Sequence, residues 1–256
     1  MSYSLKLVLI ALLTLVLAPF VIALAPFDPQ GRRAYVFARL WTGAILRISG
    51  VRLKVCGLEH LDPSQAYIFM ANHQSYIDIP ALVQGLAPFQ LRLIAKKELV
   101  WVPVFGWALW ASKHILVDRS GGKRAVTTLR RAKEKILQGL SVVIFPEGTR
   151  GRSAGVLPFK RGGFVLAAMA NAPIVPVTIV GSGRVLPRGD WRIQKGEIEV
   201  AVDEPVIVER QELKNLAQVS NRVRSIIAAR LNRGAEQLET NSRARELGSG
   251  EARAQG

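Results

Sequence analysis

The first strong feature of the chain is a long apolar segment without a charged residue. Residues 7–26 contain a single polar side chain, Thr14, and therefore show no amphipathic period. A helix rises about 1.5 Å per residue, so this segment would reach roughly 30 Å, the thickness of a bilayer core. Pro19 would kink the helix, which membrane helices tolerate. The pattern predicts a membrane-associated helix. The alternative is a cleaved signal peptide, because residues 23–25, Ala-Leu-Ala, resemble a cleavage site.

A second segment, residues 34–49, is apolar but interrupted by Arg39 and Arg47, with Tyr35 and Trp41 between and beside them. Basic groups directed at headgroups and aromatic rings at the boundary are typical of a helix in the membrane interface. The same pattern fits a core helix that covers a globular domain. Both interpretations stay open from the pattern alone.

From residue 50 the pattern changes to short apolar strands that alternate with helical segments. Strands are predicted over residues 51–58, 66–71, 91–95, 114–118, 141–145, 173–180 and 197–202. Helices are predicted from residue 75 onward and over residues 123–139, 162–170 and 212–232. This alternation predicts an α/β fold: a single domain with a mixed, largely parallel central sheet flanked by helices, preceded by the N-terminal membrane-associated helical segment.

Three parts follow from these patterns. Residues 1–49 form the membrane anchor and interfacial helix, and residues 50–233 form the α/β domain. Residues 234–256 are rich in Ser, Gly, Glu and Arg, so we expect a polar, disordered tail there.

Charge narrows the class of partner. Lys and Arg number 35 against 19 acidic residues, a formal net charge of +16, which indicates an anionic partner. The apolar N-terminal segment favours membrane lipids and phosphorylated substrates over nucleic acid. Arg32, Arg33 and Arg39 follow that segment, so the positive-inside rule predicts a cell (inner) membrane location with the α/β domain on the cytoplasmic face. A lone cysteine and three scattered histidines make a metal site improbable.

The stretch NHQSYID, residues 72–78, carries the first candidate chemistry. In the simplest interpretation Ser75 caps a helix and Asp78 completes a capping box, which leaves His73 as a loop residue. The same spacing also suits catalysis. A strand that ends where a helix begins exposes side chains at the carboxyl edge of a sheet, and a carboxylate one turn on can orient an imidazole that takes a proton from a hydroxyl.

A second candidate is FPEGTR, residues 145–150, which directly follows a predicted buried strand. It reads either as a Pro-Gly turn with an exposed salt bridge between Glu147 and Arg150, or as a phosphate site. In the second case Gly148 offers backbone N–H groups, Thr149 a hydroxyl and Arg150 a bidentate guanidinium.

Five stretches occur in a fixed order: NHQSYID, AKKELVWVPVFG, ILVDR, FPEGTR with LPFKRGGF, and PIVPV. This series resembles the four blocks of the 1-acylglycerol-3-phosphate acyltransferase family over about residues 50–205. The resemblance implies transfer of a fatty acyl group from acyl-CoA or acyl-carrier protein to the 2-hydroxyl of lysophosphatidic acid, which gives phosphatidic acid in phospholipid synthesis. It implies no metal and no redox cofactor, and no covalent intermediate.

The resemblance also assigns roles. His73 is the general base and Asp78 its orienting partner, and Pro176 marks the block that shapes the acyl side. Lys113 stands where the family often has glycine, and we expect it to face solvent. The expected substrate-binding residues are Arg119, Glu147, Gly148, Thr149, Arg150, Lys96 and Lys160.

Two alternatives remain at this stage. A sister acyltransferase would run the same chemistry on glycerol 3-phosphate or a lyso-aminolipid. A non-catalytic basic protein at a membrane or on nucleic acid would explain the charge and the anchor, but not the paired blocks.

Overall fold

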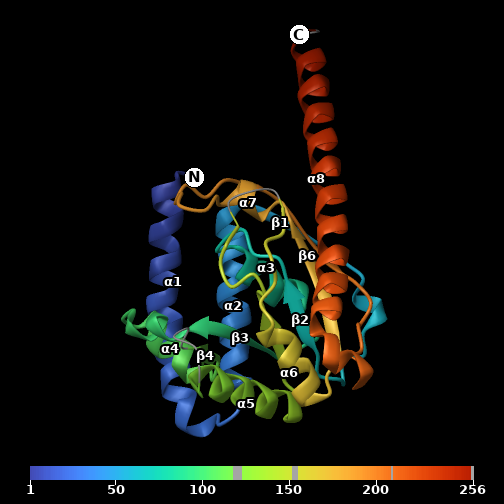
Figure 1. Ribbon diagram of the computed structural model, residues 1–256. Coiled ribbons are helices and arrows are strands. Elements are labelled where there is room, and N and C mark those ends of the chain that lie inside the picture. The colour runs from blue at the N-terminus through green and yellow to red at the C-terminus, as the bar shows by residue number, and fades with distance from the viewer. Residues whose placement is uncertain (118–122, 152–154, 209, 255–256) are drawn as a thin grey trace.

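The structure is a computed structural model that describes residues 1–117, 123–151, 155–208 and 210–254 (Figure 1). Its centre is a seven-stranded sheet in the order β1-β7-β6-β2-β5-β3-β4. Neighbouring strands pair in parallel, except β6 and β7, which are antiparallel. The strands are β1 Val51–Cys56, β2 Ile68–Ala71, β3 Leu91–Lys96, β4 Ile115–Val117, β5 Ser141–Ile144, β6 Ile174–Val180 and β7 Gly196–Val202. The predicted α/β class with a mixed, largely parallel sheet is therefore confirmed.

The central strands are buried on both faces, as continuous apolar runs in parallel sheets are. On one face, α2 (Arg32–Ser49) and α3 (Asp78–Gly85) contribute to an apolar cluster with Phe69 and Ala71 of β2. On the other, α5 (Lys123–Leu137), α6 (Gly162–Ala170) and α8 (Leu216–Ala254) pack over Ile68 and Met70. The alternation along β2 thus supplies both cores. The remaining helices are α1 Tyr3–Leu24, α4 Phe105–Ala111, α7 Ser182–Val185 and the 3₁₀ turns η1 Ala25–Phe27, η2 Leu58–His60, η3 Lys97–Trp101 and η4 Arg210–Asn215.

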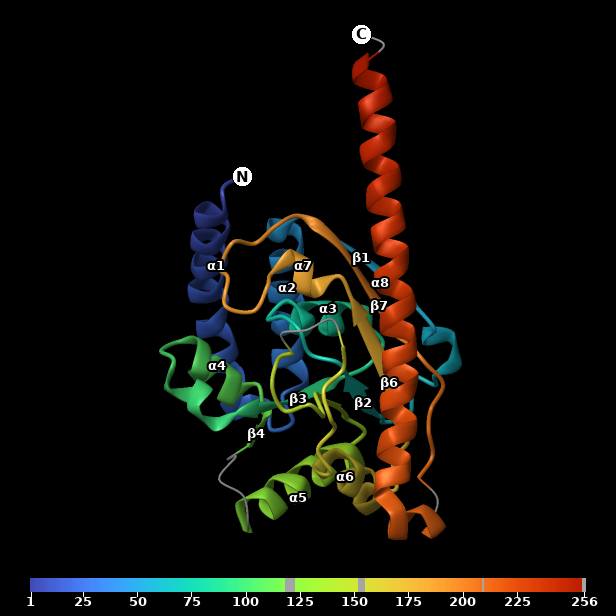
Figure 2. The same cartoon turned by 45° about the horizontal axis from the view of Figure 1, so that its top comes forward.

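The N-terminal helix α1 lies against α2 and α4 at the side of the domain (Figures 1 and 2). The span Tyr3–Phe27 is long and apolar enough to cross a membrane, and little of it is buried against the rest of the chain. Two polar side chains of α1 fix it in place. Thr14 Oγ1 accepts a hydrogen bond from Trp41 Nε1 at 2.9 Å, and the buried Lys6 Nζ donates to the carbonyls of Ser49 and Ile193 at 2.9 and 3.0 Å.

Helix α2 buries one side in the domain core. Tyr35 and Leu46 are 3% and 5% exposed and belong to the apolar cluster over the sheet. Arg39 donates to the carbonyl of Ala87 rather than extending away from the domain. One side of this helix thus packs on the domain core, and its place at a membrane interface stays a prediction.

Several elements differ from the sequence predictions. Helix α3 begins at Asp78 rather than at Ser75, because the residues between them form a turn. Helix α4 was not anticipated, since Pro103 and an unbroken apolar pattern hide its period. Helix α8 continues through Ala254, beyond residue 234 where a disordered tail is expected, and projects past the domain (Figure 1). Ala, Glu, Arg and Leu in this region are strong helix formers.

Gly57 offers a test of how tightly β1 and β7 are joined. It has a φ of +86°, and a Cβ there would lie 1.8 Å from the Val202 carbonyl oxygen. Gly189 has a φ of +87° but nothing within 4 Å of its Cβ position. Gly189→Ala should lower the free energy of unfolding by about 1–2 kcal/mol, the strain of a left-handed backbone alone. Gly57→Ala should lower it further, as measured by denaturant unfolding. An equal loss of unfolding free energy in the two variants would contradict the close approach of Gly57 to the Val202 carbonyl.

Candidate active site

Two loops meet at the carboxyl edge of the sheet because their strands are parallel neighbours. Strand β2 leads into Asn72 and His73, and β5 leads into the FPEGTR loop. Backbone contact joins the loops directly, since Gly151 N donates to the His73 carbonyl at 2.8 Å. The Asn72 side chain exchanges two hydrogen bonds with the backbone of Ile179 in β6, at 2.9 and 2.7 Å. His73 is therefore anchored to strands on both sides of β2.

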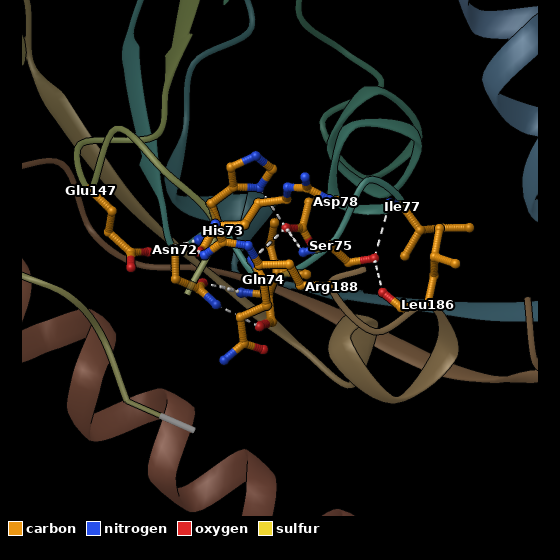
Figure 3. A network of polar contacts seen from close by, with 11 residues as sticks. Asn72, His73, Gln74, Ser75, Ile77, Asp78, Glu147, Leu186 and Arg188 are labelled. Carbon is orange, nitrogen blue, oxygen red and sulfur yellow. Dashed lines mark hydrogen bonds and ion pairs between the residues drawn. The ribbon is translucent and has the colours of Figure 1, made fainter. Parts of the chain in front are cut away.

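His73 and Asp78 form a close pair (Figure 3). The distance from His73 Nδ1 to Asp78 Oδ2 is 2.8 Å. The same oxygen accepts the backbone N–H groups of Gln74 and Ser75, each at 2.8 Å, and the Asp78 side chain is fully buried. When Nδ1 donates to this carboxylate, Nε2 is left as the proton acceptor. The Phe145 ring stacks on the imidazole at 3.9 Å between centroids and limits its rotation.

The capping interpretation and the catalytic one turn out to share the same atoms. The bond from Ser75 N to Asp78 Oδ2 has the pattern of the carboxylate half of a capping box, although the N-cap of α3 is Ile77 and not the predicted Ser75. The hydroxyl half is missing, because Ser75 Oγ accepts from Ile77 N and donates to the Leu186 carbonyl at 2.7 Å. Asp78 thus orders the turn and orients His73 at once.

Glu147 lies behind the pair rather than on the surface. It is 4% exposed, and its two carboxylate oxygens accept the backbone N–H groups of His73 at 2.8 Å and Leu157 at 3.0 Å. Burial raises the pKa of this carboxyl above its ordinary value of 4.5, while the two N–H groups oppose the shift. The exposed salt bridge to Arg150 considered from the sequence is therefore wrong. The geometry gives Glu147 a positioning role between the two loops.

One cavity of about 1100 Å³ joins most of the candidate side chains. His73 opens onto it, and Gly148 and Arg150 belong to its wall. The Arg150 guanidinium lies 3.7 Å over the Tyr76 ring. The Lys160 side chain passes so close to Gly148 that a Cβ there would lie 2.7 Å from Nζ. The predicted residues that line this cavity are His73, Lys96, Gly148, Thr149, Arg150 and Lys160. Arg119 lies outside the described residues.

His114 and Lys113 make contacts of their own, although His114 also lines the cavity. His114 Nδ1 accepts the N–H of Leu93 at 3.1 Å, and burial lowers the pKa of His114 to about 3, so the ring is neutral. Lys113 directs its Nζ at the face of the Trp110 ring, 4.9 Å from the centroid, instead of extending freely into solvent.

Sequence reasoning missed three residues of the cavity wall. Tyr76 and Trp191 stack at 5.8 Å between centroids, and Arg188 Nη1 donates to the Arg150 carbonyl. The segment VLPRGDW that contains two of them joins an arginine and a tryptophan to a Pro-Gly turn. An aromatic and a basic residue in such a loop indicate a binding segment, because loops often carry binding residues.

Glu147→Gln should change how the free energy of unfolding depends on pH, because the pKa of Glu147 is raised in the folded state. The folded state binds the Glu147 proton more tightly than the unfolded state, so this group lowers the free energy of unfolding as pH rises from about 4.5 through the raised value. Glutamine removes that dependence. Denaturant unfolding between pH 4 and 7 should show that the free energy of unfolding of the variant increases relative to that of the wild type as pH rises. A difference in the free energy of unfolding that stays constant with pH would contradict the raised pKa of Glu147.

Comparisons with known proteins identify the family of this chain. The family model "Acyltransferase" matches residues 52–180. The human 1-acyl-sn-glycerol-3-phosphate acyltransferase alpha is 35% identical over 187 residues, 73% of this chain and 66% of that protein. A relative of the same name from Chlamydomonas reinhardtii is 30% identical over 220 residues, 85% of this chain and 63% of that protein. This chain thus spans slightly less than two thirds of the length of these relatives.

Among solved structures, the crystal structure of the 1-acyl-sn-glycerophosphate (LPA) acyltransferase PlsC from Thermotoga maritima aligns with a TM-score of 0.60 and 27% identity. The alignment covers 86% of this chain and 97% of that one. The family match extends over the strands and loops that hold His73, Asp78 and the FPEGTR segment. This chain belongs to the acyltransferase family.

Proposed function

We propose that the chain transfers a fatty acyl group from acyl-CoA or acyl-carrier protein to the 2-hydroxyl of 1-acylglycerol 3-phosphate, which yields phosphatidic acid. The observation that carries this proposal is the His73–Asp78 pair, 2.8 Å apart, with His73 in the wall of a cavity. Basic side chains that reach the surface line one part of this cavity, here called its mouth, and apolar side chains line the part here called its interior. An amphiphile with a phosphate and an acyl chain fits these two environments. The names of the relatives support the same acceptor.

The reaction proceeds as a single displacement through a tetrahedral centre. The acceptor oxygen attacks the thioester carbonyl carbon while His73 Nε2 takes the hydroxyl proton. The C–S bond then breaks, the ester forms, and the imidazolium returns its proton to the departing thiolate. Asp78 stabilises the imidazolium, because its buried carboxylate lies against Nδ1. General-base help of this kind contributes about 10² to 10⁴ in rate.

The two ends of the cavity suggest how the acceptor lies. The guanidinium of Arg150, the ammonium of Lys160 and the turn at Gly148 and Thr149 supply donors for a phosphate at the mouth. Lys96 lines the same cavity, and Arg119 is a further expected phosphate ligand. The interior is apolar, with walls from the N-terminal helices and α4; its residues include Leu7, Ile10, Ile45, Phe105 and Leu109.

The membrane has a role in this proposal because the acceptor is a lipid. Trp101, Trp107 and Trp110 are 84%, 53% and 56% exposed on η3 and α4, next to α1. The opposite side of α4 lines the cavity through Phe105 and Leu109. Tryptophan is enriched where membrane meets water. We therefore place α1 and the η3–α4 surface in the cell (inner) membrane, with the domain on its cytoplasmic face and the net charge of +16 toward anionic lipids and acidic carrier protein.

His73→Ala tests the mechanism. Acyl transfer should fall by about 10²-fold or more, since the general base is lost. Membrane binding, measured by vesicle flotation, should be unchanged. His60→Ala is the matched control, because His60 is partly exposed and away from the cavity. The assay should offer lysophosphatidic acid, glycerol 3-phosphate and a lyso-aminolipid in parallel, each with acyl-CoA and acyl-carrier protein. Unchanged transfer by the variant would refute the mechanism, and transfer by the wild type to none of these acceptors would refute the function.

Replacing the three exposed tryptophans of η3 and α4 with serine tests the membrane contact. Each indole buries on the order of 150–250 Å² when covered, so partition to vesicles should weaken by about tenfold or more. Leu137→Ser is the control, because Leu137 is 68% exposed on α5, which covers the other face of the sheet. Equal partition of both variants, measured by co-sedimentation with anionic vesicles, would contradict the placement.

A further inference from the structure

A basic side chain beyond the matched family region reaches the cavity. Arg188 lies in residues 186–195, the segment between α7 and β7, here called the 186–195 loop. It lines the cavity together with His73, Arg150 and Lys160. Figure 3 shows Arg188 in the same group of residues as the His73–Asp78 pair. Arg188 thus lines the cavity from a segment other than the FPEGTR loop and contacts that loop at the Arg150 carbonyl.

The 186–195 loop is held in place by contacts at both ends. Ser75 Oγ donates to the Leu186 carbonyl at 2.7 Å, which ties the loop to the turn that carries His73. Lys6 Nζ donates to the Ile193 carbonyl at 3.0 Å, which ties the far end to α1. Between them Trp191 stacks on Tyr76. Arg188 is therefore carried on a segment with a defined position relative to His73.

The contacts of Arg188 leave most of its hydrogen-bonding capacity free. Within the described ranges its one hydrogen bond runs from Nη1 to the Arg150 carbonyl, and no carboxylate of those ranges pairs with it. A guanidinium has five N–H donors in a planar fork. The bond to the Arg150 main chain fixes one edge of the fork beside the second arginine. The other donors remain available to a ligand.

Three cationic side chains line one cavity mouth, and the repulsion between their charges favours the binding of an anion there. Arg150, Arg188 and Lys160 all line the same wall, while the carboxylates nearby are already engaged: Asp78 by His73 and the turn, and Glu147 by two backbone N–H groups. A phosphomonoester carries about two negative charges and three acceptor oxygens, which suits two guanidinium forks and an ammonium.

We propose that Arg188 binds the acceptor's phosphate and makes the site select a phosphorylated acceptor; this rests on the proposed function. The donor also carries phosphate groups, but the long pantetheine arm separates them from the thioester. In the acceptor only two carbons and one ester oxygen lie between the reacting hydroxyl and phosphorus. A cation that lines the same cavity as His73, on a loop tied to the His73 turn, therefore matches the phosphate of the acceptor.

The test compares Arg188→Ala and Arg188→Lys with Arg192→Ala. Arg192 lies in the same loop but is turned to the surface carboxylate of Asp190 at 3.1 Å, so it controls for changes in loop charge. KM is measured for lysophosphatidic acid, for 1-acylglycerol, for acyl-CoA and for an acyl thioester of N-acetylcysteamine, which has no phosphate. Binding of glycerol 3-phosphate is measured separately by calorimetry.

Arg188→Ala should raise KM for lysophosphatidic acid about ten- to hundredfold, as expected for a lost charge-assisted contact. KM for acyl-CoA and use of 1-acylglycerol should be unchanged, lysine should restore part of the loss, and Arg192→Ala should match the wild type. Equal losses with lysophosphatidic acid and 1-acylglycerol would overturn the proposal in favour of a structural role. A rise in KM for acyl-CoA alone would overturn it in favour of the donor phosphates. A wild type that binds glycerol 3-phosphate through Arg188 but transfers no acyl group would refute the proposed function and leave the anion site standing.

Discussion

The candidate site depends on one buried carboxylate. Asp78 Oδ2 receives three N–H groups, two from the backbone of its own turn and one from the His73 ring, each at 2.8 Å. A buried carboxylate is costly without donors, and the three N–H groups on Oδ2 offset part of that cost, while Oδ1 has no hydrogen-bond partner among the described residues. The charge in turn fixes which nitrogen of His73 faces the cavity. The same oxygen of Asp78 therefore orders the turn and orients the base.

A second buried carboxylate completes the arrangement from the other loop. Glu147 holds the main-chain N–H of His73, whereas Asp78 holds its side chain. The two acids come from loops more than sixty residues apart and meet because β2 and β5 are parallel neighbours. The sheet order places β5 between β2 and β3, so strands that follow one another in the sequence are separated in space. A slip of the β2–β5 register would uncouple the two acids.

The cavity explains why the apolar N-terminus and the catalytic loops occur in one chain. Helix α1 supplies both an exposed apolar surface and part of the cavity wall, through Leu7 and Ile10. Its Lys6 also holds the 186–195 loop, which carries Arg188 to the cavity mouth. In the proposed reaction a lipid would enter with its chain toward the apolar interior and its headgroup toward the basic rim. Helix α1 would therefore contact the acyl chain of such a substrate and hold the loop that faces its headgroup.

Short-range patterns were enough to find the strands and the α/β class, since period and capping act within about ten residues. They singled out His73 and Asp78 by spacing but left capping and catalysis open, and the catalytic roles came from the resemblance of the ordered blocks. They also identified the loop with Arg150, because a turn at a strand end is a local feature. Other features needed the folded chain. The burial of Glu147 and the approach of Arg188 and Trp191 to His73 depend on strand order and on contacts between residues 70 to 120 positions apart. Nothing in a local window encodes such contacts, because the packing of the whole sheet brings those segments together.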